Sequence, residues 1–194
     1  MKYGLKIMTG PSVEPVTVAE AKAHLRLEHS ADDTLIGSLI TAARLFIESV
    51  TSRAFMTQTL MMTLQCFPAC GRIDLVRSPV QTVSHIKYLD SAGALQTLDS
   101  ANYALSAGRE PAQIWKASNG TYPLVLTDNP NAVQVTYVAG YGNNASDVPE
   151  NVKQAIKFLV SHWYENRETV TSSNFSEMPL ALQALINQIS ITQV

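Results

Sequence analysis

Histidine and cysteine are the side chains that most readily bind a metal or act as nucleophiles, and this chain contains few of them. Cys66 and Cys70 are separated by three residues, and no second Cys or His pair follows to complete a zinc site. His24 and His29 are five residues apart, which is not the spacing of two ligands on one helix face. We therefore predict no metal site. The cysteines should be two small apolar side chains in a reducing compartment, with a disulfide as an unsupported alternative.

Carboxylates and glycines form two further patterns with catalytic potential. Asp32-Asp33 resembles a carboxylate pair, but such a pair in front of an apolar helical segment more often caps the helix. Gly140-Tyr141-Gly142 lacks the third glycine of a phosphate-binding loop and is typical of a tight turn. The nucleophile motif G-x-S-x-G is absent from the sequence. We predict that the chain is not an enzyme and binds no cofactor; a small enzyme with a site assembled from distant residues is the alternative.

Aromatic and arginine side chains indicate a different chemistry, the anchoring of a protein interface. Trp163 and Tyr164 are adjacent, and Arg167 follows Trp163 by about one helical turn. These residue types are enriched at interface hot spots, although packing in the core is the plain alternative. The interface candidates are Trp163, Tyr164, Arg167, Phe175, Leu182, Leu185 and Ile189.

The overall composition limits the kinds of partner. With 194 residues, of which 46% are hydrophobic, the chain can bury a core, while its charged fraction of 15% is well below the roughly 25% of typical soluble domains. The net charge of -2 and the lack of any Lys/Arg cluster argue against sequence-specific binding of duplex DNA. No apolar run approaches the roughly 18 residues of a membrane span, and no signal-peptide pattern is seen. We expect a protein that is made in a cytoplasm and has no membrane partner.

Helical periodicity marks the N-terminal region of the chain. Thr17 and Glu20 form a capping-box pattern, which predicts a short helix to about Leu27. A longer helix capped at residues 32–33 should end near residues 51–52, and its apolar face must pack on something. That face consists of Leu35, Ile36, Leu39, Ile40, Ala43, Ile47 and Val50.

Helical signals return near the end of the chain. Asp147 as N-cap with Pro149 in the first turn predicts a helix to about Glu168. The polar residues 169–177 should form a loop, and Pro179 can start a final apolar helix. We expect this loop and helix to move or become ordered when a partner docks, so that a chain truncated after Glu168 would fold but fail to join its partner.

The middle of the chain changes to the period of two that is typical of strands. Leu60, Met62 and Leu64 alternate with other residues, and residues 132–138 alternate in the same way. A turn signal at residues 90–93 predicts a hairpin. The remaining predicted strands are 72–76, 80–89, 94–98, 101–106, 113–116 and 124–126. Short, closely spaced strands of this kind indicate a small antiparallel sheet or sandwich.

Short motifs along nearly the whole chain add a resemblance to these patterns. They are Glu14-Pro15-Val16-Thr17, residues 19–26, Asp32-Asp33, Ala42-Ala43-Arg44 with Glu48, Arg53-Ala54, Gln58-Thr59, Phe67-Pro68, Pro79-Val80, Ile86 with Tyr88 and Asp90, residues 139–142, Val148-Pro149 and residues 164–168. In this order and spacing they resemble the head–tail connector (adaptor) proteins of tailed bacteriophages, in the longer form with a β-rich insertion. Ser52 stands where this family commonly has glycine, and Tyr122-Pro123 stands where it commonly has Trp-Pro.

The resemblance implies an α+β fold: a helical connector core, made of an N-terminal helix pair and C-terminal helices, with an inserted small antiparallel sheet or sandwich. The three segments would be 1–55, 56–142 and 143–194. It also implies a structural subunit of the virion head–tail junction, made in the bacterial host cytoplasm. About a dozen copies would form a ring below the portal protein, extend the DNA channel and receive the next head-completion or tail protein. Double-stranded DNA would pass without sequence-specific binding. Another phage tail-completion or binding module is the alternative.

Overall fold

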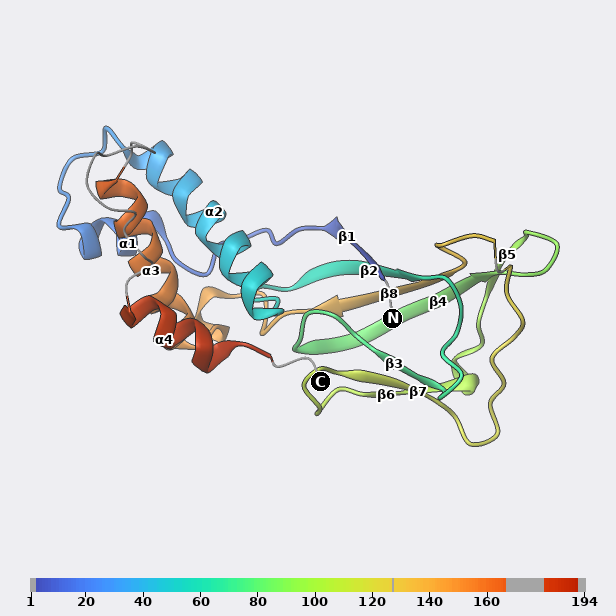
Figure 1. Cartoon of the computed structure of the whole chain (residues 1–194). Helices are drawn as coiled ribbons and strands as arrows, with labels where there is room; N and C mark the ends of the chain where they lie inside the picture. The colour runs from blue at the N-terminus through green and yellow to red at the C-terminus, as the bar shows by residue number, and fades with distance from the viewer. Residues whose placement is uncertain (1–2, 127, 167–179, 192–194) are drawn as a thin grey trace. The chain divides into compact units, whose positions relative to one another are not determined.

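The computed structural model describes residues 3–126, 128–166 and 180–191, which form two compact units (Figure 1). Within these residues, the helical unit comprises residues 12–56 and the chain from residue 142 onward, and the sheet unit comprises residues 3–11 and 57–141. The chain therefore combines helices with antiparallel sheets, which confirms the predicted α+β class.

The helical unit is built on apolar residues at three- and four-residue spacing. Its elements are α1 (Val18–Leu25), α2 (Asp33–Thr51), the 3-10 turn η2 (Ala145–Asp147), α3 (Glu150–Glu165) and α4 (Leu180–Ile189). Helix α2 contacts each of the other three helices. Ile36, Ile40 and Ile47 of α2 are fully or almost fully buried, as are Ile156 and Val160 of α3. The predicted apolar face thus contains the core side of α2, but two of its members, Leu35 and Val50, are exposed.

Helix α2 also has the length and composition of a membrane span among the described residues. Three charged residues lie in this helix, so no uninterrupted apolar run in it reaches the length of a span. Two of them, Arg44 and Glu48, are buried and paired with each other inside the helical unit. Since α2 packs against α1, α3 and α4, its buried apolar residues lie at the centre of this unit.

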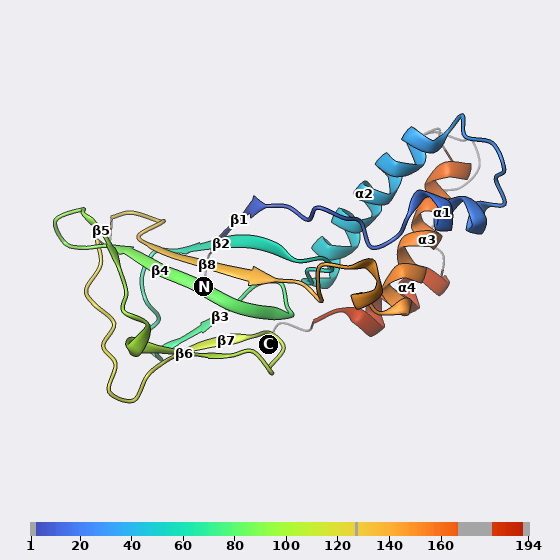
Figure 2. The same ribbon diagram turned by 180° about the vertical axis from the view of Figure 1, so that it is seen from behind.

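The sheet unit contains two antiparallel sheets. The larger sheet has the order β1 (Gly4–Thr9), β2 (Gln58–Leu64), β8 (Val133–Ala139), β4 (Val80–Leu89) and β5 (Leu95–Thr97). The smaller sheet has the order β3 (Arg72–Asp74), β7 (Gln113–Lys116) and β6 (Tyr103–Ser106), with the 3-10 turn η1 (Ser100–Asn102) before β6. Strands β2, β8 and β4 lie side by side at the centre of the larger sheet (Figure 2).

Strict alternation of burial confirms the period of two in β2 and β8. Along each of these strands, every second residue is buried and its neighbours are partly exposed. Leu60 pairs with Tyr137 and Met62 pairs with Val135, and all four side chains are buried on one face of the sheet. The Tyr137 hydroxyl donates a hydrogen bond to the carbonyl of Val76, which satisfies the polar end of this buried ring.

Strand β1 was not predicted, and it changes the division of the chain. Residues 3–11, expected in the helical segment 1–55, belong to the sheet unit. The strand is short, carries Lys6 and has no regular alternation of burial, so its sequence has no clear strand pattern. It forms through pairing with β2, in which Leu5 lies opposite Met62 and Ile7 lies opposite Leu60. A contact between residues so far apart in the sequence is invisible to a local pattern.

Two other local predictions were wrong. Residues 124–126 form no strand; the N–H of Leu126 donates a single backbone hydrogen bond to the carbonyl of Leu89. The residue that caps α3 is Pro149, because the Asp147 carboxylate instead accepts the N–H of Asn144 at 2.9 Å and closes the preceding 3-10 turn.

Candidate interaction surface

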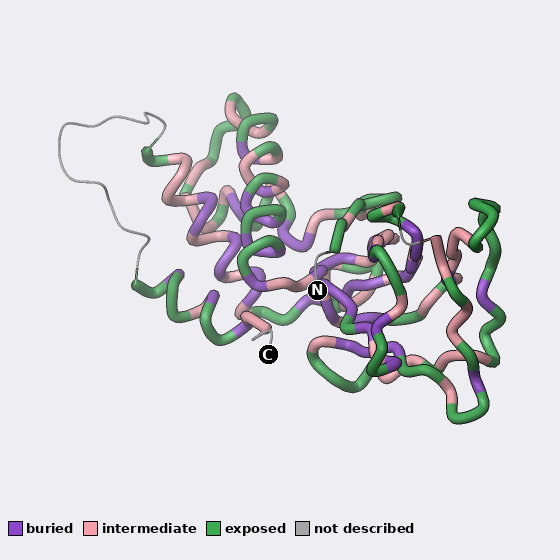
Figure 3. The backbone as a smooth tube through the Cα atoms, turned by 45° about the vertical axis from the view of Figure 1, so that its right-hand side comes forward, coloured by how far each residue is buried: buried purple, intermediate pink, exposed green. Residues whose placement is uncertain are grey.

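The outward-facing residues of α2 form an exposed surface without charge in the helical unit. Eight residues of this helix are exposed, and none of them carries a charge. We call this set the α2 outer face; it consists of Thr34, Leu35, Ser38, Ala42, Leu45, Phe46, Ser49 and Val50. Figure 3 shows exposed and buried segments alternating along the turns of the helices. Because Leu45 is 42% exposed and Val50 is 46% exposed, large apolar side chains here meet water.

Helix α3 adds an aromatic side chain beside this surface. The rings of Phe46 and Trp163 meet edge to face, with centroids 6.1 Å apart and planes at 74°. This geometry is favourable for two aromatic rings. Trp163 is partly buried and Phe46 is exposed, so the pair spans the border between the core and the surface. The predicted anchor Trp163 therefore lies next to the α2 outer face.

Tyr164 has a different position from its neighbour. It is partly buried, and its hydroxyl donates a hydrogen bond to the carboxylate of Asp32, directly before α2. This contact joins the end of α3 to the start of α2. Tyr164 thus helps to hold the two helices together, in addition to the interface role predicted for it.

A buried ionic network holds α2 against the segment that precedes α1. The guanidinium of Arg44 donates from Nε to Glu14 Oε2 at 2.7 Å and from Nη2 to Glu14 Oε1 at 3.2 Å. It also donates from Nη1 to Glu48 Oε2 at 3.1 Å, and Glu48 Oε1 accepts the N–H of Phe55 at 2.8 Å. Burial alone would lower the pKa of Arg44, but the hydrogen bonds and charges of Glu14 and Glu48 raise it.

The network explains why the α2 outer face lacks charge. Of the three charged residues of α2, Arg44 and Glu48 point into the helical unit, where they are 5% and 0% exposed. Asp33, the third, pairs with Lys22 of α1 at 2.8 Å. No charged side chain of α2 is therefore left for its outer face, which only Ser, Thr and apolar residues form.

The remaining predicted interface residues are divided between the core of α4 and the undescribed segments of the chain. Leu182 and Ile189 are buried within the helical unit, and Leu185 is partly buried. Arg167 and Phe175 lie outside the described residues. The interface role of these five residues stays a prediction.

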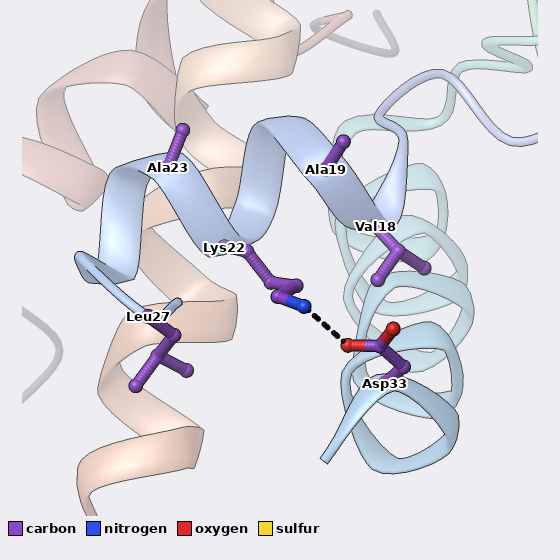
Figure 4. Close-up of a pocket in the computed structure, with 6 residues that line it drawn as sticks. All are labelled: Val18, Ala19, Lys22, Ala23, Leu27 and Asp33. Carbon is purple, nitrogen blue, oxygen red and sulfur yellow. Dashed lines mark ion pairs between the residues drawn. The ribbon is translucent and has the colours of Figure 1, made fainter. Parts of the chain in front are cut away.

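An open hollow lies beside α1 in the helical unit (Figure 4). Its volume is about 510 Å³, and its lining residues are Val18, Ala19, Lys22, Ala23, Leu27 and Asp33. Its two charged side chains, Lys22 and Asp33, form an ion pair with each other across α1 and α2. An apolar hollow whose only charges neutralise each other offers little for acid–base catalysis.

The histidines and cysteines that were considered as metal ligands or nucleophiles do not form a metal site within the described residues. Within the described ranges, no group of three His, Cys, Asp or Glu side chains could hold a metal ion. The ring of His24 packs edge to face on Phe158, with centroids 5.7 Å apart. Cys66 and Cys70 are free thiols, so they form no disulfide with each other, and both are exposed.

The glycine pair after β8 forms a close turn. Gly140, in the sheet unit, has a φ of 133°, a backbone conformation that residues with a side chain rarely adopt. A Cβ on Gly142 would lie 2.1 Å from a carboxylate oxygen of Asp147, so only glycine fits there. The geometry of the turn accounts for both glycines, so phosphate binding is not needed to explain them.

The sequence and fold are both similar to those of known proteins. The family profile described as Head completion protein matches residues 14–177. A subunit from the neck of an empty GTA particle computed with C6 symmetry has 25% identity and a TM-score of 0.81, over 98% of this chain and 97% of its own. A chain from the virion of a native gene transfer agent (GTA) particle has 26% identity and a TM-score of 0.81, over 98% and 96%.

A third solved chain extends the likeness in fold alone. It comes from the neck of a native GTA particle computed with C12 symmetry, with 24% identity and a TM-score of 0.76 over 100% of this chain and 97% of its own. Among curated proteins, none matches this sequence significantly.

Proposed function

Since this chain belongs to the head completion protein family and is a structural head–tail connector subunit of a phage-like particle, we propose that it acts in the virion neck as one copy in a ring of about a dozen. One observation carries the proposal. The similarity to neck subunits extends over nearly the whole chain, so it includes both the helical unit and the sheet unit. The C6 and C12 symmetries of the similar necks support a ring of many identical copies.

The two units have different roles in this proposal. The helical unit is the connector core, with the helix pair α1 and α2 completed by α3 and α4. The sheet unit, apart from its N-terminal edge strand β1, is a module inserted between the two halves of this core. The order of the elements supports the division, because β2 to β8 all lie between α2 and α3.

The ring would dock below the portal protein, extend the DNA channel and receive the next head-completion or tail protein. In this role the chain works by packing and has no enzymatic activity. The low charged fraction of 15% and the net charge of -2 suit a channel wall along which duplex DNA slides without being held. The subunit would be made in the cytoplasm of the bacterial host and assembled into the virion there.

Helix α4 bears on the idea that the end of the chain becomes ordered on docking. The guanidinium of Arg53 donates to the carbonyl of Ile189, and the N–H of Ile191 donates to the carbonyl of Thr51 at 3.0 Å. Leu182 is also fully buried. Truncation after Glu168 would expose the apolar surface that α4 covers. The expectation that such a chain stays folded is therefore not supported, and truncation is not a clean test of docking.

Complementation of defective heads tests the function with the full chain. Heads assembled without this protein should fail to join tails, and the added purified protein should restore tailed particles counted by electron microscopy. Quantitative mass spectrometry of the restored particles should find about a dozen copies per particle. The variant Gln183→Glu, at an exposed position of α4, serves as a matched control and should restore joining equally well. Heads that join tails just as well without the protein would overturn the proposal.

A further inference from the structure

Apart from the contact of Phe46 with Trp163, no described contact covers the large apolar side chains of the α2 outer face, and the face carries no charge. It extends about 24 Å along the helix from Thr34 to Val50. Leu35, Leu45 and Val50 are between 37% and 46% exposed. Several large apolar side chains exposed on one helix face are typical of a site of association.

The fold of the subunit does not depend on this face. The core side of α2 is the opposite one, where Ile36, Ile40 and Ile47 are at most 1% exposed. The Arg44–Glu48 pair lies on the core side too, and it fixes α2 independently of the outer residues. The apolar residues of the outer face are therefore unexplained by the stability of a single copy.

The occupant of this face must itself be apolar and uncharged where it makes contact. A charged side chain placed against Leu45 and Phe46 would lose its water without gaining an opposite charge. This requirement argues against the DNA backbone as the occupant and in favour of another protein surface.

A second copy of the chain meets this requirement. Subunits of similar fold, matched over 97% of their length, come from necks with C6 and C12 symmetry, in which identical copies surround one axis. A ring of identical copies closes through a heterologous contact, in which each copy presents two different faces. The chain also has exposed large apolar side chains in and beside β1, namely Tyr3, Ile7 and Met8, which are available for the other contact.

We propose that the α2 outer face is the surface by which one copy contacts the next copy in the ring. This inference rests on the proposed function and adds to it the residues that make the contact. Leu45 and Phe46 are its centre, and Trp163 supports Phe46 from behind through the edge-to-face contact.

Site-specific photo-crosslinking in assembled particles tests which protein occupies this face. Phe46 is replaced by p-benzoylphenylalanine, and irradiation should give a product of twice the 21.1 kDa of one chain, containing peptides of this chain alone. The same probe at Glu150, whose side chain is 79% exposed, should give at least tenfold less of this product. A crosslink to a portal or tail protein, or equal yields at both positions, would overturn the proposal.

A substitution on the face gives an independent measurement. Leu45→Glu should reduce the number of copies incorporated per particle at least tenfold, because the new carboxylate would be desolvated at the contact. Its far-UV circular dichroism and melting temperature should match those of the unchanged chain, because Leu45 is exposed in the single subunit. Gln183→Glu introduces the same charge on another exposed helix position and should incorporate normally. Normal incorporation of Leu45→Glu would contradict the inference.

The two proposals can fail separately. If the unchanged chain restores tail joining but Phe46 crosslinks to another protein, the connector function stands and the copy–copy contact is wrong. If the unchanged chain does not restore tail joining, the connector function itself fails, whatever the crosslink shows.

Discussion

The last turn of α2 depends on a serine with a left-handed backbone. Ser52 has φ 56° and ψ 35°, and its N–H donates to the carbonyl of Glu48. Glycine adopts this conformation without the steric penalty of a Cβ, and the connector family that this sequence resembles commonly has glycine here. Ser52→Gly should therefore raise the free energy of unfolding by about 1 kcal/mol, measured by urea denaturation. An unchanged or lower value would show that the serine side chain compensates for its backbone.

A second residue-scale prediction concerns Arg44. The variant Arg44→Leu removes the guanidinium that pairs with the fully buried carboxylate of Glu48. Removal of one partner of a buried ion pair typically destabilises by about 3–5 kcal/mol. Equilibrium unfolding in urea should therefore show a loss of this order. A loss below about 1 kcal/mol would mean that water reaches Glu48.

The double variant Arg44→Leu/Glu48→Leu is the control for this explanation. It removes both charges and should recover some of the lost free energy of unfolding. Recovery stays incomplete, because the N–H of Phe55 loses its acceptor on Glu48, and an unsatisfied buried donor costs about 1–3 kcal/mol. A double variant less stable than Arg44→Leu would contradict the idea that the lost ion pair with Arg44 is the main cause of the destabilisation.

At the scale of elements, the start of α1 depends on a titratable cap. The Thr17 Oγ1 accepts the N–H of Glu20 at 3.1 Å, and Glu20 Oε2 accepts the N–H of Thr17 at 2.7 Å. The hydrogen bonds from the Thr17 backbone and side chain lower the pKa of Glu20 below its ordinary value of 4.5. With the folded-state pKa depressed, the contribution is complete above about pH 4.5 and is lost as the pH falls through the folded-state pKa.

The variant Glu20→Gln tests this dependence. Glutamine retains a side-chain acceptor but does not titrate, so the unchanged chain should be more stable than the variant at pH 6. That difference in the free energy of unfolding should shrink as the pH is lowered from 4.5 toward 3. Urea denaturation across this range measures it. A difference that grows on acidification would show that the protonated form of Glu20 stabilises the cap more than the ionised form does.

The capped helices and alternating strands were the elements that the sequence could predict. The capping box at Thr17 and Glu20 marked the start of α1, and the periodicity around Ile36 and Ile40 marked α2. Both signals are local, because a cap and an amphipathic face are made by neighbouring residues. Strand β1 was missed and the N-cap of α3 was predicted wrongly for the opposite reason. Each depends on which of several possible partners a residue pairs with.

The α2 outer face shows where periodicity alone is insufficient. Leu35 and Val50 were expected on the packed face of the helix, yet both are exposed. Leu45 and Phe46 were not singled out, although a helix with apolar residues on both sides and only three charged residues was a signal that could have found them. An apolar residue facing a partner subunit obeys the same pattern as one facing the core. Only the fold shows which apolar side of the helix is buried in the core of the subunit and which is exposed.

At the scale of the whole chain, each unit is assembled from segments that are far apart in the sequence. The sheet unit takes its edge strand β1 from the N-terminus, and the helical unit takes α3 and α4 from after the sheet. The described chain therefore passes from one unit to the other after residues 11, 56 and 141. A linear division at changes of composition assigns the middle of each segment correctly but misses an excursion as short as β1.

The charge of the whole chain leads to a prediction about DNA. Fourteen basic and sixteen acidic residues give a net charge of -2, and the sequence contains no basic cluster. Proteins that hold duplex DNA neutralise several phosphates and weaken steeply with salt. Fluorescence anisotropy with a labelled duplex should therefore show no saturable binding up to about 10 µM protein at physiological salt. The variant Glu28→Lys/Glu150→Lys reverses two exposed charges, changing the net charge from -2 to +2, and should bind measurably better at low salt. Saturable, salt-sensitive binding by the unchanged chain would contradict the expectation that duplex DNA passes this protein without being bound.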